Sequence, residues 1–179
     1  FRNAENQGLA YWKEKVGGES EALELPFDHP RPAIQSFHGA ENFFVLSGDL
    51  TQKLGNLSRH QNVTLFMTLL AAFKTLLLRY SDQDDIPPVG VPFANRGCSE
   101  IENVIGFFVN TVVLRTDISG NPAFETLLAR VREVTLEAYA HPDVPFGNLI
   151  EAIHPDRDPG RQPFFQVMFI LQNTLPAEL

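Results

Sequence analysis

The sequence predicts an α/β fold in which helices cover both faces of a mixed sheet. Two segments, Ile105 to Thr116 and Phe164 to Leu171, are apolar at consecutive positions, which is typical of central strands buried on both faces. Thr64 to Arg79 is also strongly apolar but longer, with its few polar residues at helical spacing. Strands and helices that alternate along one chain favour a layered α/β architecture.

The first part of the chain predicts a helix, a connector, a strand and a second helix. Apolar residues at helical spacing predict a helix over 5 to 16, which Gly17 and Gly18 end. Three prolines between Leu25 and Pro32 predict an extended crossing segment. A strand is expected over Glu41 to Ser47. A helix should follow, because three leucines then share one face: Leu50, Leu54 and Leu57.

The second part of the chain predicts further helices between strands. The helix from Thr64 to Arg79 should be mostly buried. The segment Ile86 to Ala94 is strand-like, but its three prolines place it at a sheet edge or make its start irregular. Asn121 as cap and Pro122 at the first position announce the next helix. A shorter helix should start near Pro145.

The composition limits the kinds of partner and the cellular compartment that are expected. The chain has 179 residues, of which 44% are hydrophobic and 20% charged, so it can bury a core. Its formal charge of -8 repels phosphate backbones and anionic membrane surfaces, so neither nucleic acid nor a membrane is expected as a partner. The single cysteine, Cys98, cannot form an internal disulfide, which favours the cytoplasm. Because the chain starts at Phe1 without a Met, we expect an excised segment.

Common catalytic and metal-binding motifs do not occur in the sequence. The five histidines are scattered and form no pair at metal-ligand spacing, so no metal site is expected. There is no serine-hydrolase elbow, phosphate-binding loop or dinucleotide fingerprint. Cys98 is interpreted as a loop residue rather than a nucleophile, although Arg96 lies close by in sequence.

Three polar sites interrupt apolar surroundings, where an unsatisfied group costs about 1–3 kcal/mol. The amide of Asn110 either cross-links its strand to a loop or lines a cavity. His141 is either a general base or a residue at a helix end, and Asp143 is placed to cap the helix that follows. Arg157-Asp158-Pro159-Gly160-Arg161 predicts a turn whose flanking charges pair.

Together these segments resemble the late motifs of nonribosomal peptide synthetase condensation domains. The family's IGxFVNT motif, followed by Arg, is matched by IGFFVNT and Arg115. Its HQDxPFE is similar to HPDVPFG from His141 to Gly147, and its RDxSRxPL to RDPGRQPF from Arg157 to Phe164. The resemblance extends to Tyr11-Trp12, LPFDHPRP, VPFANR and FFQVMFILQN, and so covers essentially the whole chain.

The resemblance implies a lobe of the chloramphenicol-acetyltransferase-like fold, the second half of a two-lobed condensation domain. Residues 1–35 would form the N-terminal helix and crossing segment, and 36–179 the core lobe. The family's catalytic HHxxxDG motif does not occur in the sequence. The fragment is therefore expected to supply one wall of the substrate tunnel, to hold no catalytic residue, and to be inactive alone.

The resemblance also implies the reaction and the partners. A complete domain joins a donor acyl thioester to an acceptor aminoacyl thioester, each carried on the phosphopantetheine of a carrier protein, in secondary-metabolite or antibiotic biosynthesis. The expected partners are the N-terminal lobe, peptidyl or acyl carrier proteins and a neighbouring adenylation domain, and no cofactor is bound directly. The resemblance shifts Asn110 toward the substrate channel, while Arg115, His141, Asp143, Arg157, Asp158 and Arg161 are kept as structural motif residues.

Two alternatives remain open at this point. The chain could be a lobe of an epimerisation or heterocyclisation domain, which shares the fold. The intact FVNT sequence disfavours epimerisation, whereas heterocyclisation is marked chiefly by the upstream motif. The other alternative is a noncatalytic module that only docks carrier proteins.

Overall fold

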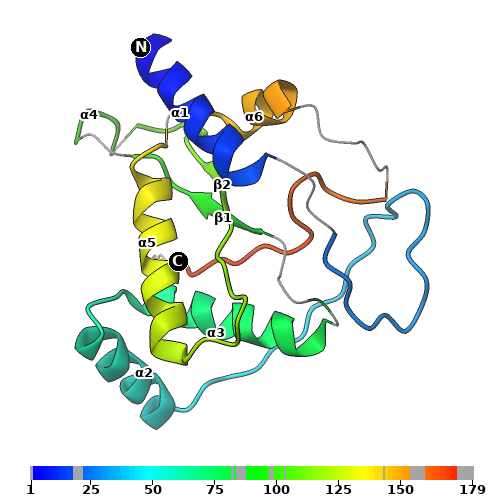
Figure 1. Cartoon of the computed structure of the whole chain (residues 1–179), viewed down its shortest axis with the longest axis vertical. Helices are drawn as coiled ribbons and strands as arrows, with labels where there is room; N and C mark the ends of the chain where they lie inside the picture. Colours follow the sequence, from blue (N-terminus) through cyan, green and yellow to red (C-terminus); the bar gives the residue numbers. More distant parts are fainter. Residues whose placement is uncertain are drawn as a thin grey trace.

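The computed structural model describes residues 2–17, 22–81, 83, 88–96, 99–102, 104–142, 144–153 and 160–172. In these ranges a small sheet is surrounded by helices (Figure 1). In chain order the elements are α1 (Arg2–Val16), α2 (Gly48–His60), α3 (Leu65–Tyr80), β1 (Val89–Phe93), α4 (Ser99–Glu102), β2 (Asn110–Leu114), α5 (Phe124–Tyr139) and α6 (Phe146–Ile153).

The sheet is mixed, and β1 lies at its centre. β1 and β2 are antiparallel, with Phe93 opposite Asn110 and Val89 opposite Leu114. On its other side Gly90 forms a parallel bridge with Met168, in which the Gly90 N–H donates to Val167 O at 3.0 Å and its carbonyl accepts from the Phe169 N–H at 2.9 Å. The apolar residues of both strands are covered on both faces, none being more than 2% exposed in the set Val89, Val91, Val112, Val113 and Leu114. The α/β class predicted from the sequence is confirmed.

The helices pack on this sheet and on one another. α5 and α6 contact β2, α3 packs against α5, α2 against α3, and α1 against α6 (Figure 1). α1 and the start of the crossing segment belong to the same core, because Trp12, Val16 and Leu23 are each at most 4% exposed and cluster with the sheet residues. The division of the chain at residue 35 therefore stays a prediction, and packing is continuous across it.

Most of the predicted helices form where expected. Ser47 caps α2 by accepting from the Leu50 N–H, and Thr64 caps α3 by accepting from the Met67 N–H. The cap predicted for α5 is wrong. Asn121 lies in the left-handed region at φ 49°, so the chain turns there, and the cap position of α5 is Ala123 instead.

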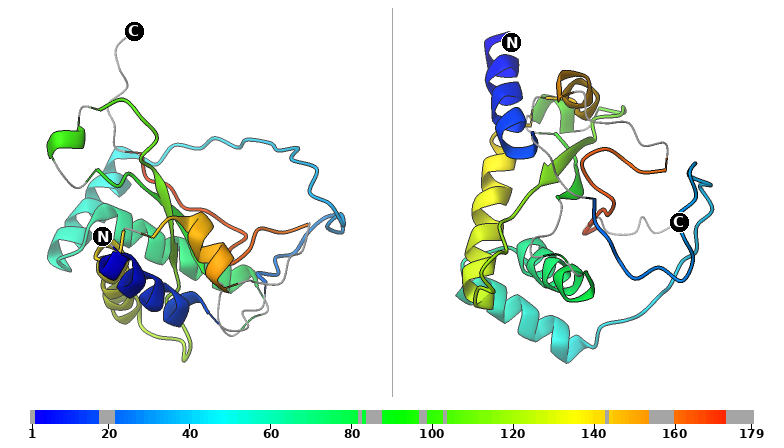
Figure 2. Two further views of the ribbon diagram at one scale, coloured as in Figure 1. Left: turned by 90° about the horizontal axis from the view of Figure 1, so that it is seen from above. Right: turned by 45° about the vertical axis from the view of Figure 1, so that its right-hand side comes forward.

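The strand predictions were too long. Within Ile105 to Thr116 only β2 is a strand, because its partner β1 ends at Phe93 and Asn95 then turns left-handed at φ 48°. Phe164 to Leu171 meets the sheet only through the bridge at Met168, after a left-handed Phe164 at φ 67°. Glu41 to Ser47 is no strand among the described residues. It belongs to a long excursion, residues 22–47, which starts against the core at Leu23 and then leaves the body of the molecule (Figure 2).

α3 buries more polar groups than its pattern predicted. Lys74 is fully buried, and its Nζ donates to the carbonyl of Leu114 at 3.0 Å, which ties α3 to the end of β2. Thr68, at 1% exposure, shares a 2.7 Å hydrogen bond with Ser58 of α2. Burying a charge inside a mostly apolar helix is costly unless the charge finds a hydrogen-bond partner. The presence of Lys74 in this apolar segment could therefore have predicted a bond from α3 to another element.

No single helix in the described ranges is long and apolar enough to cross a membrane. α2 and α3 pass that test only when taken together, and they bend by 105° at their break.

Candidate functional site

Asn110 begins β2 and connects the sheet to the segment that leads into α6. This segment consists of residues 141–142 and 144–146 and is called the 141–146 loop. Its Nδ2 group donates to the carbonyls of Val144 at 2.8 Å and Pro142 at 3.3 Å. Its Oδ1 accepts from the N–H of Phe146 at 3.0 Å and of Thr111 at 2.9 Å. Both amide hydrogens and both lone pairs of the carbonyl are thus used. The structure therefore gives Asn110 the loop cross-link that the sequence left as one of its two interpretations, and its channel role stays a prediction.

The same amide caps α6. Phe146 is the first residue of α6, where backbone N–H groups have no partner inside the helix. Asn110 supplies an acceptor for that N–H from a different element. Asp143, the cap expected from the sequence, lies outside the described residues, as do Arg157, Asp158 and Cys98.

α1 holds the 141–146 loop from the other side. The indole N–H of Trp12 donates to the carbonyl of His141 at 3.0 Å, and the ring of Tyr11 stacks on the imidazole with centroids 4.2 Å apart. The helix approaches so closely that a Cβ on Gly8 would lie 2.8 Å from a methyl carbon of Val144. Two of the resembling sequences, the early Tyr-Trp pair and the histidine loop, therefore meet in space.

Charged groups surround the Tyr11 hydroxyl. Burial, followed by the nearby carboxylate of Glu137, raises the pKa of Tyr11 to about 12. Lys15 pairs with Glu137 at 2.7 Å and lies 5.6 Å from the centre of the Tyr11 ring. Tyr11 therefore stays neutral at physiological pH, and the imidazole of His141 rests on an uncharged ring.

The third motif anchors the crossing segment. Arg161 lies 3.9 Å from the carboxylate of Glu24, and Arg31 donates to the carbonyl of Gly160 at 3.4 Å. Gln166 accepts from the N–H of Leu23 at 2.8 Å. The contacts near residue 160 thus tie residues 23–31 to the strand-like segment beside β1. Arg161 pairs with Glu24 and not across the turn, and the structural interpretation of this motif stays a prediction.

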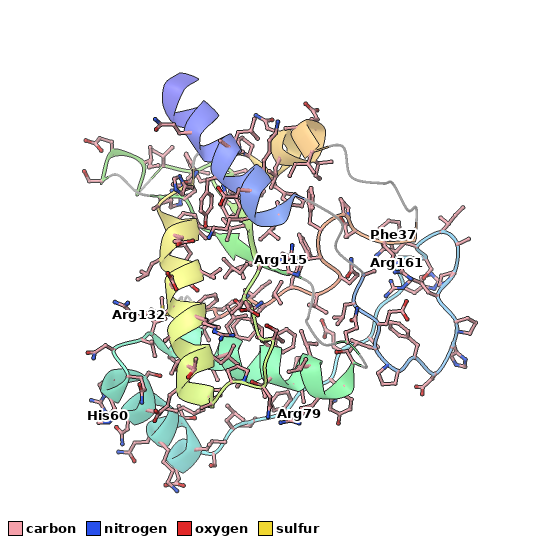
Figure 3. The ribbon with its side chains drawn as sticks, viewed as in Figure 1. Phe37, His60, Arg79, Arg115, Arg132 and Arg161 are labelled. Carbon is pink, nitrogen blue, oxygen red and sulfur yellow. The ribbon has the colours of Figure 1, made fainter. Side chains whose placement is uncertain are left out.

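Arg115 lies apart from these contacts. It follows β2, is half-buried, and has no hydrogen bond or ion pair to any described residue. Figure 3 shows it near the middle of the molecule and well separated from Arg161 on the side of the 22–47 excursion. The structure brings Asn110 and His141 into one site and leaves Arg115 and Arg161 outside it.

Arg96, which lies close to Cys98 in sequence, holds the loop before β2. Its guanidinium donates to the carbonyls of Ile101 at 2.6 Å and Val104 at 2.9 Å, and lies 4.5 Å from the centre of the Phe108 ring. It thereby shapes the loop before β2, residues 104–109, with Phe108 folded back. Ile105 and Phe107 point outward instead, at 101% and 92% exposure. The sequence pointed to Arg96 only through the segment VPFANR, which is part of the family resemblance.

The contacts of Asn110, Trp12 and Tyr11 position the 141–146 loop. No group of three or more histidine, cysteine or carboxylate side chains able to hold a metal ion occurs in the ranges that the structure describes. The side chain of His141 is half-buried, and its ring stacks on Tyr11.

Comparison with known proteins decides the family. A family model described as the condensation domain matches residues 2–178. The chain belongs to the condensation-domain family. It is 56% identical to one of the linear gramicidin synthase proteins of Brevibacillus parabrevis over 92% of its length, and 43% identical to a surfactin synthase protein of Bacillus subtilis, also over 92%. The chain spans only about 3% and 4% of those two relatives.

Solved structures confirm the fold of this condensation-domain segment. A four-domain nonribosomal peptide synthetase bound to AMP and glycine superposes with a TM-score of 0.90 at 27% identity, covering 94% of this chain and 13% of the other. The X-domain from teicoplanin biosynthesis superposes with a TM-score of 0.83 at 29% identity, covering 91% and 36%. The chloramphenicol-acetyltransferase-like lobe expected from the motifs is thus confirmed.

Proposed function

We propose that this chain is the C-terminal lobe of a condensation domain that forms peptide bonds in a nonribosomal peptide synthetase. The observation that carries the proposal is the condensation-domain match from residue 2 to residue 178. Relatives such as the gramicidin synthase protein are synthetases many times longer than this chain. Antibiotic or other secondary-metabolite biosynthesis is the corresponding setting.

In the proposed reaction the amine of a carrier-bound aminoacyl thioester attacks the carbonyl carbon of a carrier-bound acyl thioester. A C–N bond forms, the C–S bond breaks, and the donor carrier's phosphopantetheine thiol leaves with a proton. No base for this step is assigned to the present chain, because the family's HHxxxDG sequence does not occur in it. Asn110 and the 141–146 loop form part of the tunnel wall in this proposal.

The 104–109 loop is proposed as the contact with the N-terminal lobe. Arg96 fixes its backbone, while Ile105, Phe107 and Val109 are exposed at 101%, 92% and 47%. Clustered apolar side chains of this kind usually mark an interface. Carrier proteins and an adenylation domain complete the proposed set of partners.

The test is dipeptide formation. The complete condensation domain, mixed with one acyl-loaded and one aminoacyl-loaded carrier protein, is expected to give dipeptide detectable by mass spectrometry. The 179-residue chain alone is expected to give none above the uncatalysed background. Product from the isolated chain would contradict the assignment and direct the search for a base to His141, His154 and the carboxylates.

A binding module is the second candidate function. The X-domain that this chain resembles has also been solved as a complex with OxyB, at a TM-score of 0.84 and 29% identity. A complete domain that carries HHxxxDG but gives no dipeptide, while still binding a carrier protein, would favour this candidate. An epimerised or cyclised product would favour the other members of the fold.

A further inference from the structure

Residues 42–46 are an extended segment without a pairing partner among the described residues. Phe43, Phe44 and Val45 are 85%, 80% and 95% exposed. Their backbone groups make no hydrogen bond to any residue in the described ranges. The segment ends at Ser47, which caps α2 and fixes where the extended chain stops.

The order of these side chains identifies the environment that they fit. In an extended chain Phe43 and Val45 project to one face, and Phe44 and Leu46 to the other. Apolar residues on both faces characterise a strand inside a sheet that is covered above and below. An edge strand with one face in water would alternate with polar residues instead. The segment is therefore built as an interior strand.

A second segment shows an unfinished sheet edge on the same side of the molecule. Residues 167 and 169 direct their carbonyl and N–H toward Gly90 of β1, so the backbone groups of Met168 point to the opposite edge. Met168, Ile170 and Leu171 are 46%, 55% and 37% exposed. Figures 1 and 2 show residues 160–171 between β1 and the 22–47 excursion.

From these two segments we infer that the sheet continues beyond residues 167–169, and that residues 42–46 pair there with β-strands contributed by another part of the same condensation domain. The inference rests on the proposed function, which makes this chain one part of a larger domain. The chain covers 36% of the X-domain chain that it superposes on, so a domain of that size contains further chain from which such strands can come. A second copy pairing through its own residues 42–46 fits less well, since it would leave both apolar faces in water.

Amide hydrogen exchange in the complete domain tests the inference. Strands on both sides of residues 42–46 engage successive amides, so all of them should exchange at least about 100-fold more slowly than amides 33–39 of the same excursion. Equal exchange in the two stretches overturns the inference. The inference is also overturned if amides 42–46 are protected in the isolated chain and their protection grows with protein concentration. The pairing partner would then be a second copy.

A matched pair of variants gives an independent readout. Val45→Asp and Ile34→Asp both place a charge on an exposed apolar residue of the excursion, at 95% and 73% exposure. Val45→Asp should lower the melting temperature of the complete domain by several degrees, while Ile34→Asp should not. Equal effects contradict the pairing. Because these measurements do not use dipeptide formation, a protected strand in an inactive domain refutes only the proposed function, and an unprotected strand in an active domain refutes only this inference.

Discussion

At the scale of single residues, the amide of Asn110 in an apolar strand connects the sheet to the 141–146 loop. Asn110 was conspicuous because its neighbours are apolar, and the structure gives it four hydrogen bonds, three of them to the 141–146 loop. The sequence alone could not name these partners, because they lie more than thirty positions away. These four bonds use every polar atom of the Asn110 amide. In the substrate channel proposed above, Asn110 would therefore act by holding the 141–146 loop in place.

Removing this amide should destabilise the fold. Asn110→Ala leaves the carbonyl of Val144 and the N–H of Phe146 without their partner, so we expect the free energy of unfolding to fall by about 1–3 kcal/mol. Asn110→Asp keeps an acceptor for Phe146 but puts a carboxylate oxygen against the two carbonyls, and should be no better. Denaturant unfolding of the isolated chain measures both variants, and a change below about 0.5 kcal/mol for Asn110→Ala would refute the cross-link.

Tyr11 should make the fold sensitive to alkaline pH. Its pKa is raised from 10.0 to about 12, so between those values the unfolded chain ionises Tyr11 while the folded protein keeps it protonated. Stability is thus fully present below pH 10 and is lost as the pH rises toward 12. Tyr11→Phe should reduce the loss measured by thermal unfolding across this window. An unchanged slope would show that burial of Tyr11 does not matter. Burial also raises the pKa of Tyr139, so Tyr139→Phe should reduce the loss in the same direction.

At the scale of elements, helix α1 is seated on the loop by close backbone approach rather than by amphipathic packing alone. Trp12 supplies the buried bulk and a hydrogen bond to His141, and Gly8 leaves the space that Val144 occupies. A glycine inside a helix normally costs stability, so its presence at position 8 has a packing reason.

Two glycine substitutions should therefore act in opposite directions. Gly8→Ala adds a methyl group 2.8 Å from Val144 Cγ2 and should cost about 1 kcal/mol or more, despite the better helix propensity of alanine. Gly55→Ala in α2 meets nothing within 4 Å and should gain about 0.5–1 kcal/mol. Melting temperatures of the two variants measure this, and stabilisation by both would show that α1 is not seated on the loop.

At the scale of the whole molecule, the most exposed apolar side chains include two groups, one in the 104–109 loop and one in residues 42–46. The 104–109 loop was expected to be a buried strand, and the structure instead holds it out from the sheet through Arg96. An exposed cluster of this type favours association in water.

Association should depend on the 104–109 loop. The double variant Ile105→Asp with Phe107→Ser alters residues that are 101% and 92% exposed, so folding should be unaffected while self-association falls. Light scattering at increasing concentration measures the effect. Leu136→Asp, at a 46% exposed position of α5, is the matched control. Equal behaviour of the double variant and the unchanged chain would remove this loop from the proposed interface.

The sequence by itself determined the α/β class, the family and the principal helices, because helical periodicity is local and because several motifs in a fixed order identify a family. The spacing of Leu50, Leu54 and Leu57, for example, predicted α2. Tertiary structure alone decided how far the strands extend and which partners Asn110 and Lys74 find. Strand pairing joins residues far apart in sequence, so the apolar run from Ile105 becomes sheet only where β1 is present to pair with it, and the run of Phe43, Phe44 and Val45 has no such partner within the described residues.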